Sequence, residues 1–338
     1  MSKMKDIVIE LGLTPEQCKD KEISKFALQV GYRKQTGDWY QYWDGNGYCE
    51  INKKNGTMIT TVLTDEEFKP EFPLNIDMNI STVCTNGCPF CYEGCSANGK
   101  HADIKKYINN KNSFLYSIHE GTELALNGNE PLHPDLELLL NFCKERNILA
   151  NLTVNENTLI LHKSKIKYFL EEGLIHGIGI SPTKYSYEMI EFCRDYPTAV
   201  IHTIAGITSP EQYEYIKDKG LKILILGYKT FGRGIQYSNK YDNEIINNIN
   251  ILRDNCLDMI KHFKLVSFDN LAIEQLNVKN KLNEKDWSKF YRGDDGHHTF
   301  YVDLVEEKFA KNSIQPREER QDLLDNVSTM LKIIQEGV

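Results

Sequence analysis

Short apolar runs alternate with helix-like segments from residue 74 onward, and this alternation restricts the fold more than any other feature of the chain. Strands that alternate with helices are typical of βα units, in which successive strands join one parallel sheet. Six such units predict an α/β fold, built as an open or partial (β/α)6 barrel. The expected strands are residues 74–80, 123–129, 147–155, 175–181, 198–206 and 221–227.

The segments on either side of this alternation have a different character. Residues 36–62 alternate aromatic and polar residues and contain two Asn-Gly pairs, which predicts a small β-meander, preceded by a helix near residues 14–30. Residues 293–309 indicate a turn, a strand and a return, and residues 317–337 an amphipathic helix. The expected parts are an N-terminal β-rich appendage (1–73), the partial barrel (74–270) and a C-terminal α+β extension (271–338).

Composition narrows the class of protein. The 338 residues carry a net charge of −8, with 41% hydrophobic and 26% charged residues, as in ordinary soluble proteins. No apolar run is long enough to cross a bilayer, and the N-terminus lacks the apolar core of a signal peptide. We therefore expect a cytoplasmic protein with no membrane partner. The net negative charge disfavours binding to a nucleic-acid backbone.

The nine cysteines point to metal or redox chemistry, because a reducing compartment disfavours disulfides. Four of them, Cys84, Cys88, Cys91 and Cys95, lie between residues 81 and 96, directly after the first expected strand. Structural zinc sites take two close pairs that are separated by a dozen or more residues, unlike this single run. A tight run of cysteines suits an iron–sulfur cluster best.

The spacing Cys84-x3-Cys88-x-Phe90-Cys91, placed after the first strand, resembles the hallmark of the radical S-adenosylmethionine (SAM) enzymes. The resemblance covers roughly residues 74–270 and implies a partial barrel of the radical SAM type. It also implies an oxygen-sensitive [4Fe–4S] cluster on Cys84, Cys88 and Cys91, whose fourth iron binds the amino and carboxylate groups of SAM. Reductive cleavage of SAM then yields a 5′-deoxyadenosyl radical. Cys95 is expected to be an ordinary loop residue, because a fourth thiolate would occupy the SAM position; a resting-state ligand or a substrate thiol are the alternatives.

The same resemblance implies a set of SAM-binding residues at the ends of later strands. The turn of Asn127, Gly128, Asn129 and Glu130 is similar to the family's Gly-Gly-Glu-Pro turn, in which the Glu faces the SAM ammonium. A plain strand-to-helix turn is the alternative. The remaining positions are Asn155 near SAM, Ser181 at the SAM ribose or carboxylate, Phe90 near adenine, and Leu226 and Gly227 as backbone contacts to adenine.

The substrate is left open by the sequence. One hypothesis is hydrogen abstraction from a peptide or protein side chain, with the N-terminal module gripping a strand by edge pairing. A second is the same chemistry on a nucleotide or other small metabolite, with Lys229 and Arg233 binding an anionic group. A third is a non-catalytic iron–sulfur carrier or scaffold. The two enzyme hypotheses imply a low-potential electron donor, flavodoxin or ferredoxin. The extension after residue 270 lacks the cysteines that hold additional clusters in related peptide-modifying enzymes.

Overall fold

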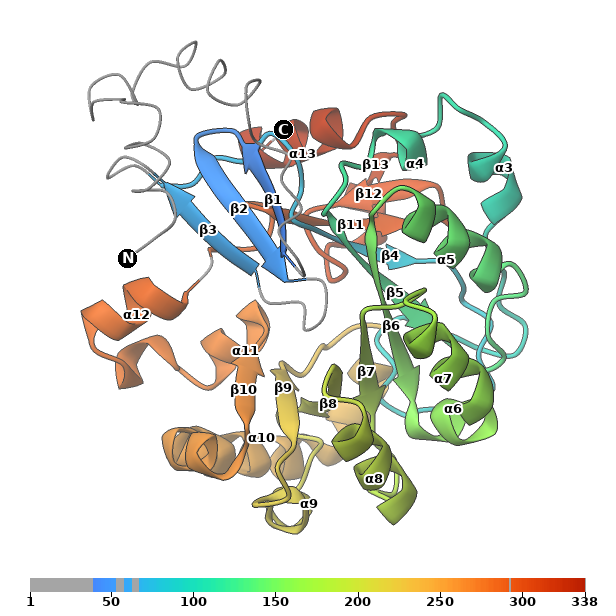
Figure 1. Ribbon diagram of the computed structural model, residues 1–338. Helices are drawn as coiled ribbons and strands as arrows, with labels where there is room; N and C mark the ends of the chain where they lie inside the picture. The colour runs from blue at the N-terminus through green and yellow to red at the C-terminus, as the bar shows by residue number, and fades with distance from the viewer. Residues whose placement is uncertain (1–38, 53–57, 63–66, 292, 338) are drawn as a thin grey trace.

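The chain forms a mixed α/β structure around a large, mostly parallel sheet, seen in a computed structural model that describes residues 39–52, 58–62, 67–291 and 293–337. The sheet has ten strands in the order β10-β9-β8-β7-β6-β5-β4-β11-β12-β13. Figure 1 shows these strands curving round in an arc, with helices on the outer side. Among the described residues β10 and β13 are free edges, so the sheet is open and forms no closed barrel.

All six strands predicted from the alternation are confirmed, and a seventh, β10, follows them in the parallel series. The chain then returns to the other side of β4, where β11 pairs with it in parallel and β12 and β13 add antiparallel strands. The strands are β4 (Asn75–Asn79), β5 (Glu123–Gly128), β6 (Leu149–Asn155), β7 (Gly177–Ser181), β8 (Ala199–Ile204), β9 (Lys222–Leu226), β10 (Leu265–Phe268), β11 (Thr299–Asp303), β12 (Lys308–Ala310) and β13 (Gln321–Asp322).

Helices join successive strands across the outer face. Their ends follow local signals, as in α9, where Ser209 and Gln212 form a capping box ahead of Pro210. The α-helices are α3 (Ile104–Ile108), α4 (Phe114–Ser117), α5 (Leu136–Glu145), α6 (Glu156–Leu161), α7 (Lys163–Glu171), α8 (Tyr187–Asp195), α9 (Pro210–Ile216), α10 (Arg233–Met259), α11 (Asn270–Gln275), α12 (Glu284–Phe290) and α13 (Val327–Glu336). Short 3-10 turns occupy Ile260–His262, Lys279–Lys281 and Arg317–Glu319. In the described part of the chain, no helix combines the length and apolarity that a membrane span requires.

Two helix predictions are wrong in detail. The segment after β6 is not one helix but two, and the break falls at His162, whose φ of −111° departs from helical geometry. At the C-terminus, only residues 327–336 are helical. Residues 317–326 form a 3-10 turn and β13 instead, because Arg320 turns inward to pair with Asp303 at 3.2 Å.

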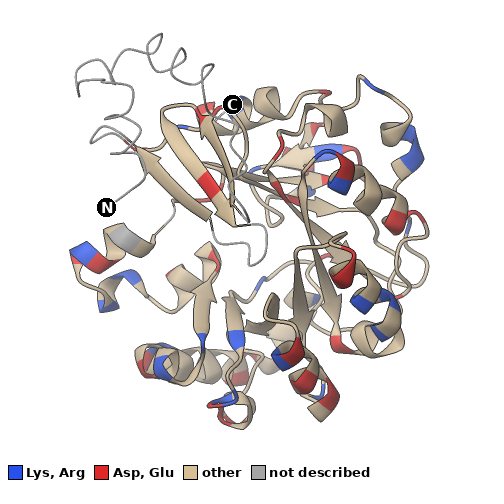
Figure 2. Cartoon of the chain, in the orientation of Figure 1, with Lys and Arg blue, Asp and Glu red and all other residues tan. Residues whose placement is uncertain are grey.

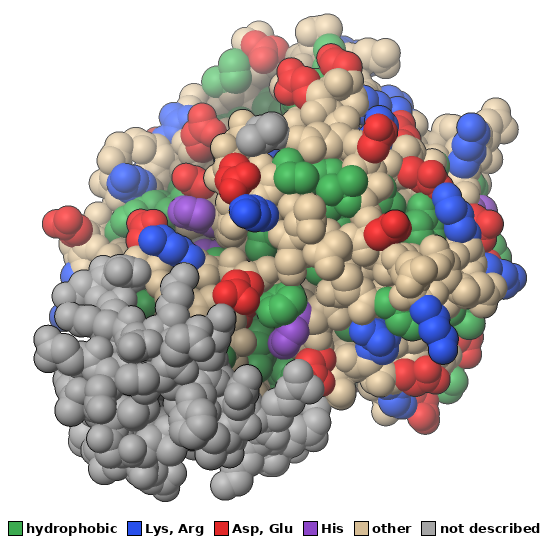
Figure 3. Space-filling view, turned by 90° about the horizontal axis from the view of Figure 1, so that it is seen from above, with side chains coloured by type: hydrophobic (Ala, Val, Ile, Leu, Met, Phe, Trp, Pro, Cys, Tyr) green, Lys and Arg blue, Asp and Glu red, His purple; other side chains and the backbone are tan. Residues whose placement is uncertain are grey.

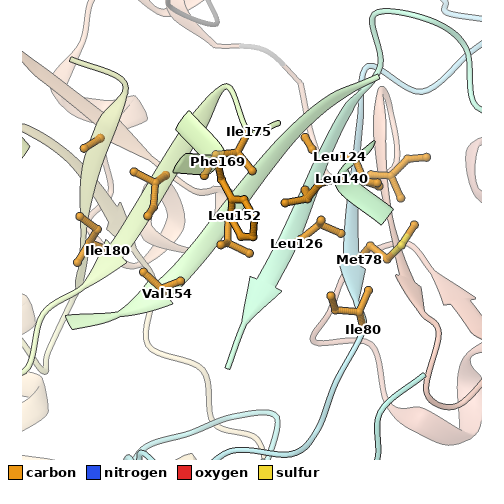
Figure 4. Close-up of a cluster of buried hydrophobic side chains, with 14 of the residues drawn as sticks. Met78, Ile80, Leu124, Leu126, Leu140, Leu152, Val154, Phe169, Ile175 and Ile180 are labelled. Atoms are coloured by element: carbon orange, nitrogen blue, oxygen red, sulfur yellow. The ribbon is translucent and has the colours of Figure 1, made fainter. Parts of the chain in front are cut away.

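The hydrophobic core lies between the sheet and its outer helices. Figure 4 shows side chains from neighbouring strands, such as Leu126 and Leu152, meeting helix residues such as Leu140 and Phe169. These side chains occupy every second position of each strand, as the period of a strand requires. Charged residues lie mainly on the helices and loops outside the sheet (Figure 2). On the described part of the face in Figure 3, basic and acidic side chains are interspersed.

The opposite face of the same strands is polar. Parallel sheets are usually apolar on both faces because helices cover both. Here most of the intervening positions are only partly buried or exposed, and most of them carry polar side chains or glycine. These inward positions include Asn75, Asp77, Glu123, Asn127, Asn151, Thr153, Asn155, Gly177, Gly179, Ser181 and His202. We call this surface the polar face. A polar face that none of the described helices covers is available for a ligand.

The N-terminal module contains the predicted antiparallel meander, made of β1 (Trp39–Asp44), β2 (Gly47–Asn52) and β3 (Met58–Val62). The first turn consists of Gly45 and Asn46, one position before the Asn-Gly pair, and Gly45 has a φ of +56°. The predicted helix near residues 14–30 and the second Asn-Gly pair lie outside the described residues.

The meander packs against the amino-terminal ends of the parallel strands. Its buried residues Tyr40 and Tyr42 form one cluster with Leu149, the first residue of β6, and with Leu74 just before β4. The aromatic ring of Tyr42 also lies 4.9 Å from that of His119, ahead of β5. The meander is therefore at the end of the sheet opposite to the cysteine loop, which follows the last residue of β4.

Candidate functional site: the cysteine loop and the carboxyl edge of the sheet

The cysteine loop, residues 81–96, leaves β4 at the carboxyl edge of the sheet and is fixed by its own backbone pairing. Ser81 and His101 form one bridge, and Val83 and Ser96 form another. Cys84, Cys88 and Cys91 are half-buried, Cys95 is buried, and all four are free thiols. The loop therefore presents three partly accessible thiols where reactive groups of α/β sheets collect.

Arg233, the first residue of α10, holds the loop at three points. Its backbone N–H donates to the carbonyl of Cys91 at 3.0 Å, its Nε to the carbonyl of Cys88 at 3.0 Å, and its Nη1 to the carbonyl of Cys95 at 2.7 Å. Gly232 precedes it with a φ of +49°, and a Cβ there would collide with the carbonyl of Tyr92. The sequence suggested an anion-binding role for Arg233; the structure instead directs this side chain to backbone carbonyls.

Amide side chains surround the thiols. Nδ2 of Asn86 lies 3.7 Å from Sγ of Cys84, and Nδ2 of Asn155 lies 3.8 Å from Sγ of Cys88. Hydrogen bonds to sulfur are one of the means by which a protein sets the potential of an iron–sulfur centre. Asn155, predicted to lie near SAM, thus lies beside a thiol, and Ser181 pairs with Asn155 in the strand register.

Electrostatics distinguish the thiols from one another. A hydrogen bond from Cys95 lowers the pKa of Cys91 to about 6, against the opposing effect of burial, and the same contact raises the pKa of Cys95. Burial raises the pKa of Cys88, and the neighbouring Cys91 and Cys84 add to the effect. The lowered pKa favours the thiolate form of Cys91, which suits a metal-binding sulfur.

The chemistry of this donor set suits an iron–sulfur cluster. The loop holds three thiols that form no disulfide, and Cys88 is close enough to interact electrostatically with Cys84 and Cys91. As placed within the described ranges, no three His, Cys, Asp or Glu side chains converge tightly enough to hold a metal ion. Binding a cluster would require the thiols to turn toward a common centre.

The turn of Asn127, Gly128, Asn129 and Glu130 docks onto the cysteine loop. Nδ2 of Asn127 and Nδ2 of Asn129 both donate to the carbonyl of Ser81 at 2.7 Å. The N–H of Thr85 donates to the carbonyl of Glu130 at 2.7 Å. Gly128 ends β5, opposite Val154. The structure thus brings the two motifs together, as the sequence predicts.

His162 is a residue of this site that sequence reasoning missed. Its Nε2 lies 2.8 Å from Oε2 of Glu130. The residue also breaks the helix after β6, which allows its side chain to reach the turn. No sequence signal marks this contact, because the helical pattern after β6 continues through His162 and the break is visible only in the structure.

The residues predicted to contact adenine bind other residues of the protein. The N–H of Gly227 donates to Oδ1 of Asp269 at 2.8 Å, and the carbonyl of Leu226 accepts from Ala205 at 2.8 Å. Phe90 packs edge-to-face on Tyr237, with ring centroids 5.7 Å apart. These residues lie at the carboxyl edge, but the N–H of Gly227 is not free to bind a ligand.

His202 is a second unexpected residue, on the polar face of β8. Its ring lies against Gly179, where a Cβ would collide with it. Burial lowers the pKa of His202 to about 4, so the imidazole is neutral near pH 7. A neutral imidazole can both donate and accept a hydrogen bond.

Glu156 anchors the loop after Ser181 and provides a stability test. Although burial would raise its pKa, hydrogen bonds from Ser186, Lys184 and Thr183 outweigh burial and lower the pKa from 4.5 to about 2. A depressed carboxylate pKa stabilises the fold above pH 4.5, and this contribution is lost as the pH falls toward 2.

We expect Glu156→Gln to lower the free energy of unfolding by about 3 kcal/mol at pH 7, the equivalent of this pKa shift. Urea unfolding measures the change. Glu188→Gln, which removes an exposed ion pair with Lys163, is the control and should change stability by less than about 1 kcal/mol. Equal losses in both variants would contradict the anchor role.

Comparisons with known proteins complete the description. No family model matches the chain, and no curated protein matches it. One solved structure that resembles it is the tryptophan synthase A-subunit from the hyperthermophile Pyrococcus furiosus. The TM-score is 0.34 and the sequence identity 13%, over 71% of this chain and 91% of that one.

Proposed function

We propose that this chain is a radical SAM enzyme with a partial (β/α)6 barrel of that type. The observation that carries the proposal is the docking of the Asn127–Glu130 turn onto the cysteine loop, through Thr85 and Ser81. An electron carrier would need the thiols alone. The turn also carries the carboxylate of Glu130, which would give the site a partner for the ammonium group that a SAM-binding cluster requires.

Each residue of the site has a proposed role. Cys84, Cys88 and Cys91 would hold the cluster, and Glu130, oriented by His162, would accept the SAM ammonium. When bound and reduced by one electron, the cluster and SAM supply methionine and a 5′-deoxyadenosyl radical, which abstracts a hydrogen atom from the substrate. Arg233 and the amides of Asn86 and Asn155 keep the loop in place. Flavodoxin or ferredoxin would supply the electron.

The position of the meander favours a small substrate over a peptide strand. A peptide paired with its edge would lie at the amino end of the sheet, and β5 alone is six residues long. At about 3.3 Å per residue, such a peptide would be about 20 Å from the cysteine loop. The polar face lies between the two ends and provides a nearer site.

The test is anaerobic. The protein is reconstituted with iron and sulfide, given SAM and dithionite, and assayed for 5′-deoxyadenosine by mass spectrometry. We expect 5′-deoxyadenosine, and a cluster EPR signal that changes when SAM is added. A cluster that assembles but neither responds to SAM nor cleaves it would contradict the proposal and favour a carrier or scaffold.

A further inference from the structure

We propose that the polar face binds a small molecule carrying an ammonium group, with Asp77 as its counter-ion. This inference rests on the proposed function, because it names the substrate class of that same site. The sequence hypothesis of an anionic substrate group relied in part on Arg233. Because that side chain binds backbone carbonyls of the cysteine loop, we propose a cationic substrate group instead.

Asp77 lies at the middle of β4, on the polar face. Solvent reaches its side chain, yet surrounding protein raises its pKa through desolvation. A group that is both accessible and desolvated lies in a hollow rather than on an outer surface. Across the sheet, the register places Asp77 in one row with Ala125, Asn151 and Gly177. The single methyl group of Ala125 leaves space beside Asp77, whereas the side chain of Asn151 lies against Gly177.

The neighbouring carboxylates already have partners. Asp269 accepts from the N–H groups of Ala272 at 2.7 Å and Gly227 at 2.8 Å. Asp295 accepts from Nδ2 of Asn270 at 2.7 Å and from Nδ2 of Asn312 at 2.9 Å. Glu93 accepts from the hydroxyl of Tyr301 at 3.2 Å. These three carboxylates are structural.

Asp77 differs, because in the described part of the chain its carboxylate accepts no hydrogen bond and forms no ion pair. The nearest cation to interact with it is Lys229. The ammonium of Lys229 instead donates to Oγ of Ser313 at 3.1 Å and lies 4.1 Å from the ring centroid of Tyr92. Desolvation disfavours the charged form of a carboxyl group that has no bonded partner, and a cationic ligand would stabilise the carboxylate of Asp77.

A buried amide on the same face points independently to a ligand. The side chain of Asn79, two residues along β4 from Asp77, belongs to a residue only 5% exposed, and its Nδ2 has no partner among the described residues. Its Oδ1 accepts from the N–H of Ser81 at 3.2 Å, so Nδ2 is the end left over.

These groups define the ligand's chemistry. The carboxylate of Asp77 is an acceptor, which an ammonium satisfies with its several N–H groups. Nδ2 of Asn79 is a donor, which a hydroxyl or carbonyl oxygen satisfies. Positions two apart on a strand are about 6.6 Å apart, so the ammonium and the oxygen should be separated by a short chain or one sugar ring. An amino alcohol or amino sugar has this form.

The test measures binding of probes by saturation-transfer NMR to the full chain, both without metal and after reconstitution. The cationic probes are 4-aminobutan-1-ol and glucosamine, and the matched neutral probes are butane-1,4-diol and glucose. We expect wild-type protein to bind the cationic members only, and Asp77→Asn to weaken that binding at least tenfold. Asp254→Asn, on the outer helix α10, is the control and should have no effect.

Three results would overturn the inference: binding of the neutral probes as tight as the cationic ones, unchanged binding in Asp77→Asn, or tighter binding of the peptide acetyl-Gly-Lys-Gly-amide than of the free amines. Should Asp77→Asn fail to fold, Asp77→Ser provides the same comparison. The failure modes are separable. Formation of 5′-deoxyadenosine without amine binding would reject only the substrate class, and amine binding without SAM cleavage would reject only the proposed function.

Discussion

Cys88→Ala is expected to lose both the cluster and SAM cleavage, while Cys95→Ala keeps both. Three thiolates are the minimum set for a [4Fe–4S] cluster with one open iron, and Cys88 interacts electrostatically with both other members of that set. Cys95 instead donates its hydrogen bond to Cys91. Anaerobic reconstitution should give about four irons per chain in the wild type and in Cys95→Ala, and background iron in Cys88→Ala.

Formation of 5′-deoxyadenosine is the second measurement on the same samples. It should fall to background only in Cys88→Ala. If Cys95→Ala loses iron and SAM cleavage as completely as Cys88→Ala, Cys95 is a fourth ligand, and the open iron on which the proposal depends does not exist.

Arg233→Ala is expected to release the cysteine loop and speed the loss of iron to a chelator. The substitution removes the two hydrogen bonds from the side chain to the carbonyls of Cys88 and Cys95. Hydrogen bonds from a charged donor contribute about 1.5–3 kcal/mol each, so the loop should lose about 3–6 kcal/mol of ordering free energy. Arg233→Lys cannot reproduce the two-pronged geometry but keeps one donor, so its rate of iron loss should be intermediate.

The matched control is Arg253→Ala. Arg253 also donates two hydrogen bonds to a backbone carbonyl, that of Gln275, at 3.2 and 3.0 Å. Its loss should lower thermal stability without changing the rate of iron release. Identical iron release from Arg233→Ala and wild type would show that the loop does not depend on this arginine.

The strands β4 to β9 could be predicted from sequence because strands that are consecutive in the chain are also neighbours in the sheet. Each strand from β4 to β9 is followed by its own helix, and the alternation of apolar residues marks both. The return of β11 to β4 could not be predicted in this way. Residues 299–303 carry a recognisable strand pattern, but nothing in that pattern specifies that they pair with residues 75–79.

The candidate site was predictable where a motif lies within one segment, as for Cys84, Cys88 and Cys91. It was not predictable where two distant segments meet. From the sequence, Arg233 was interpreted as an anion-binding residue. Its partners in the structure are backbone carbonyls, which no sequence pattern identifies. Asp77 looked like one residue of a buried strand. Its importance depends on which neighbouring carboxylates already have partners, and this is a property of the packed structure.

The pairing of β4 with β11 also bears on how the protein matures. Thr299 pairs with Asn75, so a strand near the end of the chain completes the sheet beside the strand that carries the cysteine loop. Contacts between residues so distant in sequence form slowly, because a long loop must close first. During synthesis, the loop leaves the ribosome long before Tyr301 and Arg317 are available to bind Glu93. On the proposed function, cluster loading is expected to be a late event, because a nascent chain truncated before β11 would present the thiols without the contacts that Tyr301 and Arg317 make with Glu93.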